Sequence, residues 1–176
     1  MPDNVIVYYS RTGTTRQVAE ALAAQTGWPL AEIQDVQSRA GLIGDLRCVV
    51  DNLLRRRPAF RYNGPPLANC RLAVVLAPVW IGRLAAPMRS FLHDQTPFSA
   101  RLAAVCVMAS RGGFDAAAEI ALTCDKPPQP TLVLLQRDIA SGEAFQELSA
   151  FSKSLLQGAA EHVSGPRQAW LSPNEA

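Results

Sequence analysis

Short apolar runs recur along this chain, and segments with helical spacing separate them. The clearest runs are rich in Val, Leu and Ala and cover residues 5–9, 71–77, 102–109 and 131–135. Continuous apolar runs, as opposed to alternating ones, are typical of parallel strands that helices cover on both faces. A weaker run over residues 30–36 mixes in polar residues, which suits a strand at the edge of a sheet.

The segments between these runs carry apolar residues at helical intervals, so each is expected to form a helix. Gly27 can end the first helix, and Pro58 stops the second. The second helix has a wide apolar stripe, for which burial against the sheet is favoured over the wall of a substrate cavity or a homodimer seam. The expected helices cover residues 14–26, 41–57, 82–95, 114–124 and 141–163.

Alternating strands and helices predict a doubly wound α/β fold. The simplest topology is a five-stranded parallel sheet in the order 2-1-3-4-5, with helices on both faces. A chain of 176 residues is long enough to bury one core of this kind. We therefore expect a single domain over residues 1–165, followed by a tail over residues 166–176.

The composition excludes several classes of partner. A net charge of +2 is too slight to indicate a nucleic-acid or membrane surface. The apolar runs fall short of the roughly 18 residues that a membrane-spanning helix needs. The N-terminus lacks the basic start of a signal peptide, so a cytoplasmic protein is expected. The 4 cysteines are scattered without a C-x-x-C pair, which favours buried, reduced thiols over a metal site.

Ligands of doubly wound folds bind beyond the carboxyl ends of the strands, which selects the loops 10–15, 77–83 and 109–114. In the first loop, Gly13 permits a tight turn into a helix whose free N–H groups attract phosphate. Arg11 can add positive charge or face solvent. Helix capping is the alternative role for the hydroxyl groups of this loop.

The sequence of the first loop also excludes two familiar phosphate-binding motifs. It matches neither G-x-x-x-x-G-K-[ST] nor G-x-G-x-x-G, which disfavours nucleoside triphosphates and NAD in their usual cradles. The hydroxyl donors are Ser10, Thr12, Thr14 and Thr15.

The second and third loops offer groups that suit a flat heterocycle. Trp80 can contact a ring by its face or edge, unless it is an ordinary core aromatic residue. Gly82 admits close approach of the backbone, and the paired glycines of the third loop do the same. Arg111 can offer a cation to an electron-rich ring. The candidate residues are Pro78, Val79, Trp80, Ile81 and Gly82 in the second loop, and Ser110, Arg111, Gly112, Gly113 and Phe114 in the third.

The pattern S-x-T-G-x-T after the first strand and P-V-W-x-G after the third resembles the flavodoxin-like FMN proteins, and the resemblance covers most of the chain. It implies FMN bound without a covalent link. The phosphate would be held by residues 10 and 12–15, and the isoalloxazine ring would lie between residues 78–83 and 109–114. Two departures stand out: the chain is nearly neutral, whereas flavodoxins that only carry electrons are usually acidic, and Phe114 stands where a stacking Tyr is expected.

The resemblance implies an FMN-dependent oxidoreductase whose flavin carries the chemistry, without protein catalytic residues and without a metal. The chain would either carry electrons to a redox partner protein or use a nicotinamide donor to reduce a quinone-like or other small acceptor, and the residues leave both open. A non-redox anion-binding or protein-interaction domain is the alternative.

Two other functions associated with phosphate are excluded. A response-regulator domain needs acidic residues after the first and third strands, where this chain has YYSR and APVW. A cysteine phosphatase places its Arg further from the Cys than Arg111 is from Cys106. Cys106 also lies inside an apolar strand, where a thiolate would be poorly stabilised.

Overall fold

The structure, a computed structural model, describes residues 3–36 and 41–161. Its centre is a parallel sheet in which β1 lies between β2 and β4, and β6 lies between β4 and β7. This order, β2-β1-β4-β6-β7, is the expected 2-1-3-4-5 arrangement, which is therefore confirmed. The parallel strands are β1 (Asn4–Tyr9), β2 (Leu30–Asp35), β4 (Leu72–Trp80), β6 (Arg101–Met108) and β7 (Thr131–Leu135).

The sheet gains two short antiparallel strands, so over residues 3–36 and 41–161 it has seven strands and not five. β3 (Phe60–Tyr62) pairs with β2, which therefore does not form the edge that its polar residues suggested. β5 (Arg83–Leu84) pairs with the end of β4, so the helix expected over residues 82–95 begins only at Ala86. Strands of two or three residues are too short to produce a periodic pattern in the sequence.

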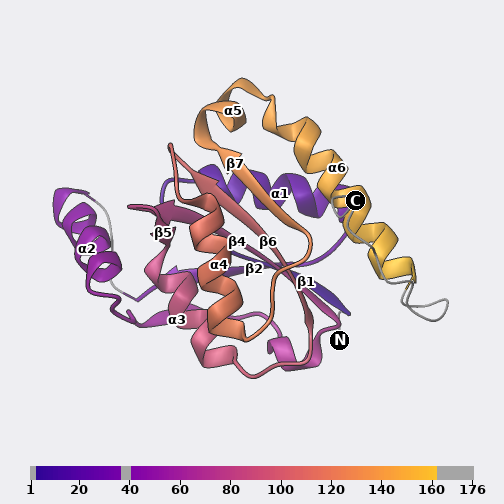
Figure 1. The fold of residues 1–176 in the computed structure, drawn as a ribbon, viewed down its shortest axis with the longest axis horizontal. Helices are drawn as coiled ribbons and strands as arrows, with labels where there is room; N and C mark the ends of the chain where they lie inside the picture. The colour runs from indigo at the N-terminus through magenta and orange to yellow at the C-terminus, as the bar shows by residue number, and fades with distance from the viewer. Residues whose placement is uncertain (1–2, 37–40, 162–176) are drawn as a thin grey trace, which may run out of the picture.

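Helices cover both faces of the sheet (Figure 1). β4 shows how alternate residues serve the two layers, because Val74 and Leu76 pack with one face's helices while Ala73 and Val75 pack with the other's. Gly142, with φ 87°, separates the last two helices. One layer holds α1 (Thr14–Thr26), α5 (Gln136–Ser141) and α6 (Ala144–Glu161), and the other holds α3 (Ala86–Gln95), α4 (Gly113–Cys124) and the 3-10 turn Leu67–Asn69.

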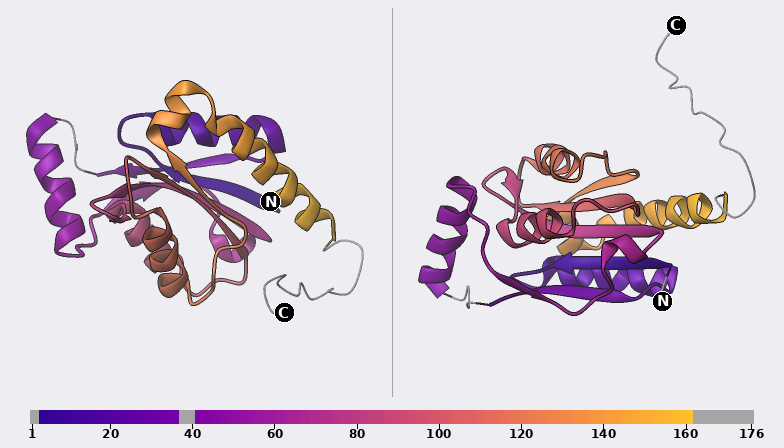
Figure 2. Two further views of the ribbon diagram at one scale, coloured as in Figure 1. Left: turned by 45° about the horizontal axis from the view of Figure 1, so that its top comes forward. Right: turned by 90° about the horizontal axis from the view of Figure 1, so that it is seen from below.

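Helix α2 (Gly41–Leu53) differs from the expectation in both position and length. It stands beyond the carboxyl ends of the strands and not against a face of the sheet (Figures 1 and 2). Leu46 and Leu53 are each 63% exposed, so this part of the apolar stripe is not covered by the sheet. The helix ends at Leu53 and not at residue 57, because Arg55 takes a left-handed conformation with φ 50°.

The boundary expected at residue 165 and the tail over residues 166–176 lie outside the described residues. Within residues 3–36 and 41–161, every helix falls short of the length and apolar content that crossing a bilayer requires.

Candidate functional site

The first loop joins β1 to α1 and leaves the amino end of the helix open. Gly13 occupies the N-cap position in a left-handed conformation, with φ 95°, and within residues 3–36 no side chain caps the helix. The Gly13 N–H donates to the Ser10 hydroxyl at 3.1 Å. The N–H groups of the first helical turn therefore have no acceptor inside the helix, which is the arrangement that binds anions. Thr15, in this first turn, is buried and lines the cavity described below.

The second loop is the β4–β5 hairpin, in which Trp80 pairs with Arg83 across a two-residue turn. Ile81 and Gly82 both have positive φ, 52° and 70°, as a turn matched to the strand twist requires. A β-branched residue such as Ile81 in the left-handed region is strained by about 1–3 kcal/mol and persists only where its surroundings hold it. The hairpin is therefore a constrained element.

Asn52 of α2 supplies one of these constraints. Its side-chain Nδ2 donates to the Trp80 carbonyl at 2.8 Å, and the residue is fully buried. Trp80 is half-buried, and its ring packs nearly perpendicular to that of Tyr9, with ring centroids 5.5 Å apart. Trp80 thus packs on the core as an ordinary aromatic residue would and also borders the cavity described below.

The third loop touches the second through glycine backbones. Gly112 has φ 90°, and a Cβ atom added there would lie 2.3 Å from the Gly82 Cα. The two loops can approach this closely only because Gly112 lacks a side chain, whereas a Cβ on Gly82 would meet no atom within 4 Å. A Cβ on Gly113 would lie 2.2 Å from Cγ1 of Val133. Phe114 is 76% exposed.

These elements surround a cavity of about 400 Å³, which we call the strand-end pocket. Among the residues whose side chains the structure describes, Arg11 is the one charged side chain in its lining, and none of the others is a carboxylate. Of the predicted residues, Gly82 and residues 110–114 do not line the pocket, and neither do Ser10, Gly13 and Thr14. The lining residues are Arg11, Thr12, Thr15, Cys48, Val49, Pro78, Val79, Trp80, Ile81, Ala109 and Gln136.

Three lining residues lie outside the loops that sequence reasoning selected. Cys48 and Val49 belong to α2, which was expected to lie against the sheet. Gln136 begins α5 directly after β7, so the rule that ligands bind at strand carboxyl ends could have found it. No comparable signal identifies Cys48 or Val49, because their place depends on where α2 docks.

Cys106 lies in the middle of β6 and is fully buried. Burial raises the pKa of its thiol to about 12, so the thiolate that a phosphatase needs is not formed at neutral pH. All 4 cysteines are buried, as expected.

Iodoacetamide is expected to modify Cys106 on the order of a hundredfold more slowly than Cys48, because the reagent attacks the thiolate and Cys48 borders a cavity. Mass spectrometry of tryptic peptides at successive times measures both rates in the native chain. Equal rates in the native chain, with equal rates again in denaturant, would contradict the burial of Cys106.

The strand order and the loops gathered at the strand ends define the class: this is a flavodoxin-like fold. A flavoprotein of Lactobacillus acidophilus in complex with FMN aligns over 80% of this chain and 98% of its own, with a TM-score of 0.65 and 17% identity. A Bacteroides eggerthii protein aligns over 85% and 99%, with a TM-score of 0.68 and 18% identity. An NADH:FMN oxidoreductase in its apo form aligns over 86% and 89%, with a TM-score of 0.50 and 18% identity. No family model matches the chain, and no curated protein matches its sequence.

Proposed function

We propose that this chain is an FMN-binding oxidoreductase of flavodoxin-like fold. The observation that carries the proposal is the first loop, where an uncapped helix N-terminus adjoins a pocket that Thr12 and Thr15 line and that no carboxylate lines among the side chains described. A phosphate is favoured at such a helix end by the free N–H groups and the helix dipole. A cavity of about 400 Å³ is within the range of small-molecule sites.

The residues suit FMN because they supply a positive charge for its phosphate and leave the backbone N–H groups of the first loop open to it. A Cβ at Gly13 would meet no atom within 4 Å, so the turn is open on that side, and Arg11 lines the pocket as a cation. The phosphate would be held by the backbone amides from Gly13 onward with the hydroxyl groups of Ser10, Thr12, Thr14 and Thr15. The isoalloxazine ring would lie between residues 78–83 and 109–114, beside Trp80. FMN, when bound, supplies reversible electron acceptance, and the chain supplies binding, orientation and exclusion of water.

The solved structures support this proposal, since one with the same fold contains FMN and another is named an NADH:FMN oxidoreductase. In the proposed reaction, electrons come from a nicotinamide donor or a redox partner protein and pass to a quinone-like or other small acceptor. We propose a cytoplasmic protein, in line with the sequence expectation. The exposed apolar residues of α2 offer a surface on which a homodimer could form.

The test is the visible absorption spectrum of the purified chain before and after FMN is added, followed by anaerobic addition of NADH or NADPH. Bound flavin that a nicotinamide bleaches directly identifies a reductase. Bound flavin that stays oxidised until a partner reductase is added identifies an electron carrier. A chain that neither contains nor binds flavin contradicts the proposal.

Replacing Ser10 tests the phosphate cradle directly. Ser10→Ala removes the hydroxyl that orders the Gly13 N–H, so FMN affinity is expected to fall about tenfold, as loss of one hydrogen bond to a charged group does. Flavin fluorescence quenching measures the change. Ser141→Ala is the matched control, because the Ser141 hydroxyl donates to the Asp138 carbonyl within its own helix. Equal affinities of the two variants would contradict a cradle at Ser10.

A non-redox anion-binding or protein-interaction domain is the second candidate. It is favoured by the third loop, where Phe114 is 76% exposed and residues 110–114 do not line the strand-end pocket. A phosphate could use the first loop without a ring beside Trp80. Binding of inorganic phosphate without binding of FMN would support this candidate.

A further inference from the structure

A second cavity, of about 590 Å³, shares the β4–β5 hairpin with the strand-end pocket. Trp80 and Ile81 line the strand-end pocket, whereas Gly82 and Arg83 line the second cavity. We call the second cavity the arginine pocket, after the four arginines in its lining. Those are Arg55, Arg57, Arg83 and Arg89, and His93 lies beside them.

Positive charge exceeds negative charge in this pocket. The acidic residues of its lining are Asp115 and Glu119. Glu119 is already engaged, because its carboxylate binds the Arg89 guanidinium at 3.0 Å and accepts the Leu84 N–H at 3.1 Å. Over the described ranges, Arg55, Arg57 and Arg83 form no ion pair. Among the described lining residues, Asp115 is thus the remaining acidic residue beside these three guanidinium groups.

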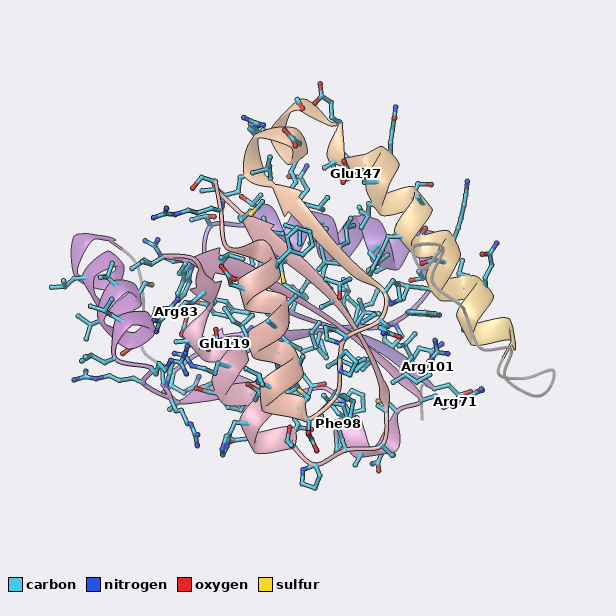
Figure 3. All side chains as sticks on the ribbon, viewed as in Figure 1. Arg71, Arg83, Phe98, Arg101, Glu119 and Glu147 are labelled. Atoms are coloured by element: carbon cyan, nitrogen blue, oxygen red, sulfur yellow. The ribbon has the colours of Figure 1, made fainter. Side chains whose placement is uncertain are left out.

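The cations come from three separate elements, and buried contacts hold these elements together. Arg89 of α3 donates to the carbonyl groups of Asp51 and Arg56, each at 3.1 Å, and so ties the end of α2 to the pocket. Arg55 lies in the segment fixed in this way and has a left-handed backbone. Arg83 comes from β5 and lies between α2 and the helix that carries Glu119 (Figure 3). The convergence is therefore a product of the fold and not of one flexible segment.

The depth of Arg89 in the pocket favours a small anion over an acidic protein as the occupant. The residue is only 7% exposed, and its Nε is buried without a hydrogen-bond partner in the described part of the chain. A protein surface resting on the rim would reach the exposed Arg55 and Arg57 but not a group at this depth. A small anion that enters the cavity would be attracted by both sets of cations.

We propose that the arginine pocket binds the phosphate groups of a soluble ligand. Guanidinium groups match phosphate oxygens in shape and charge, and several converging on one concavity form a phosphate site. Because the pocket shares its hairpin with the strand-end pocket, a ligand held here by its phosphates would lie next to the proposed flavin site. We assign it to the nicotinamide dinucleotide that serves as electron donor, and this assignment rests on the function proposed above.

The test is a calorimetric titration of sodium pyrophosphate into the chain at fixed ionic strength. Excess FMN is present throughout, so that the first loop is occupied. Arg57→Gln and Arg83→Gln are each expected to weaken pyrophosphate binding about tenfold, since each removes one charged donor. Arg71→Gln makes the same charge change at the opposite end of the molecule (Figure 3) and is expected to alter the affinity by less than about twofold. Circular dichroism verifies that each variant is folded.

Competition then identifies the source of the phosphates. Addition of NADH or NADPH is expected to weaken pyrophosphate binding, because the dinucleotide would occupy the same cations. Failure of both to compete would overturn the assignment to the donor. Absence of pyrophosphate binding at millimolar concentration, or binding that Arg57→Gln, Arg83→Gln and Arg71→Gln change equally, would overturn the phosphate site itself.

FMN binding is read separately from the visible spectrum, so the two proposals can fail independently. A chain that binds FMN but not pyrophosphate keeps the proposed function and loses the arginine pocket. If FMN does not bind, the titration is repeated without it. A loss of affinity in Arg57→Gln then supports the phosphate site alone, because Arg57 lines the arginine pocket and not the strand-end pocket.

Discussion

Gly112→Ala is expected to destabilise the chain by about 3 kcal/mol and to lower its affinity for FMN by more than about tenfold. The added Cβ would lie 2.3 Å from the Cα and 2.7 Å from the carbonyl carbon of Gly82. Because the opposing atoms are backbone, no side-chain rotation relieves the clash, and the second and third loops must separate. Urea denaturation measures the stability, and flavin fluorescence measures the affinity.

Gly27→Ala is the matched control for this change. Gly27 also has a positive φ, of 72°, but an added Cβ there would meet no atom within 4 Å. The control therefore isolates the backbone strain, which costs about 1–2 kcal/mol, and it leaves the loops at the strand ends unchanged. Equal losses of stability and equal FMN affinities in the two variants would mean that the contact between Gly82 and Gly112 does not shape the site.

The parallel core of this fold is predictable from the sequence because its pattern is local. Each central strand is a continuous apolar run, and α1 carries Val18 and Leu22 on the stripe that becomes buried. The strand order follows from general rules for such units. What escapes prediction is non-local: β3 and β5 exist because a neighbouring strand offers free backbone groups, and their own residues form no periodic pattern.

The candidate site also combines features that the sequence predicts with features that it does not. The open helix end at Gly13 follows from residue types at a strand end and could be anticipated. The turn at Ile81 and Gly82 could not, because the sequence predicts a helix from residue 82 and a β-branched residue rarely takes a positive φ. The contribution of α2 to the pocket wall is a less favoured alternative to burial against the sheet, because an apolar stripe does not reveal which surface it meets. The docking of α2 depends on Arg89 and Asn52, two polar residues in segments that sequence reasoning treated as ordinary helix.

Glu119→Gln is expected to destabilise the chain by about 3 kcal/mol. The change leaves the Arg89 guanidinium buried without a compensating charge, since the side chains of Arg89 and Glu119 are only 8% and 14% exposed. It also weakens the acceptor of the Leu84 N–H and so loosens β5. Urea denaturation measures the loss. Asp138→Asn, which breaks the exposed pair with Arg137, is the control and is expected to cost less than about 1 kcal/mol.

Proteolysis separates a local role of this network from a general loss of stability. Arg89 fixes the carbonyl groups of Asp51 and Arg56, so Arg89→Met should free the chain that follows α2. Trypsin is then expected to cleave after Arg55 and Arg56 faster than after Arg137, relative to the rates in the unaltered chain, under conditions where the variant remains folded. If cleavage accelerates equally at all three arginines, the network stabilises the whole domain. Selective cleavage after Arg55 and Arg56 identifies Arg89 as the residue that holds α2, and with it Asn52 and Trp80, at the edge of the strand-end pocket.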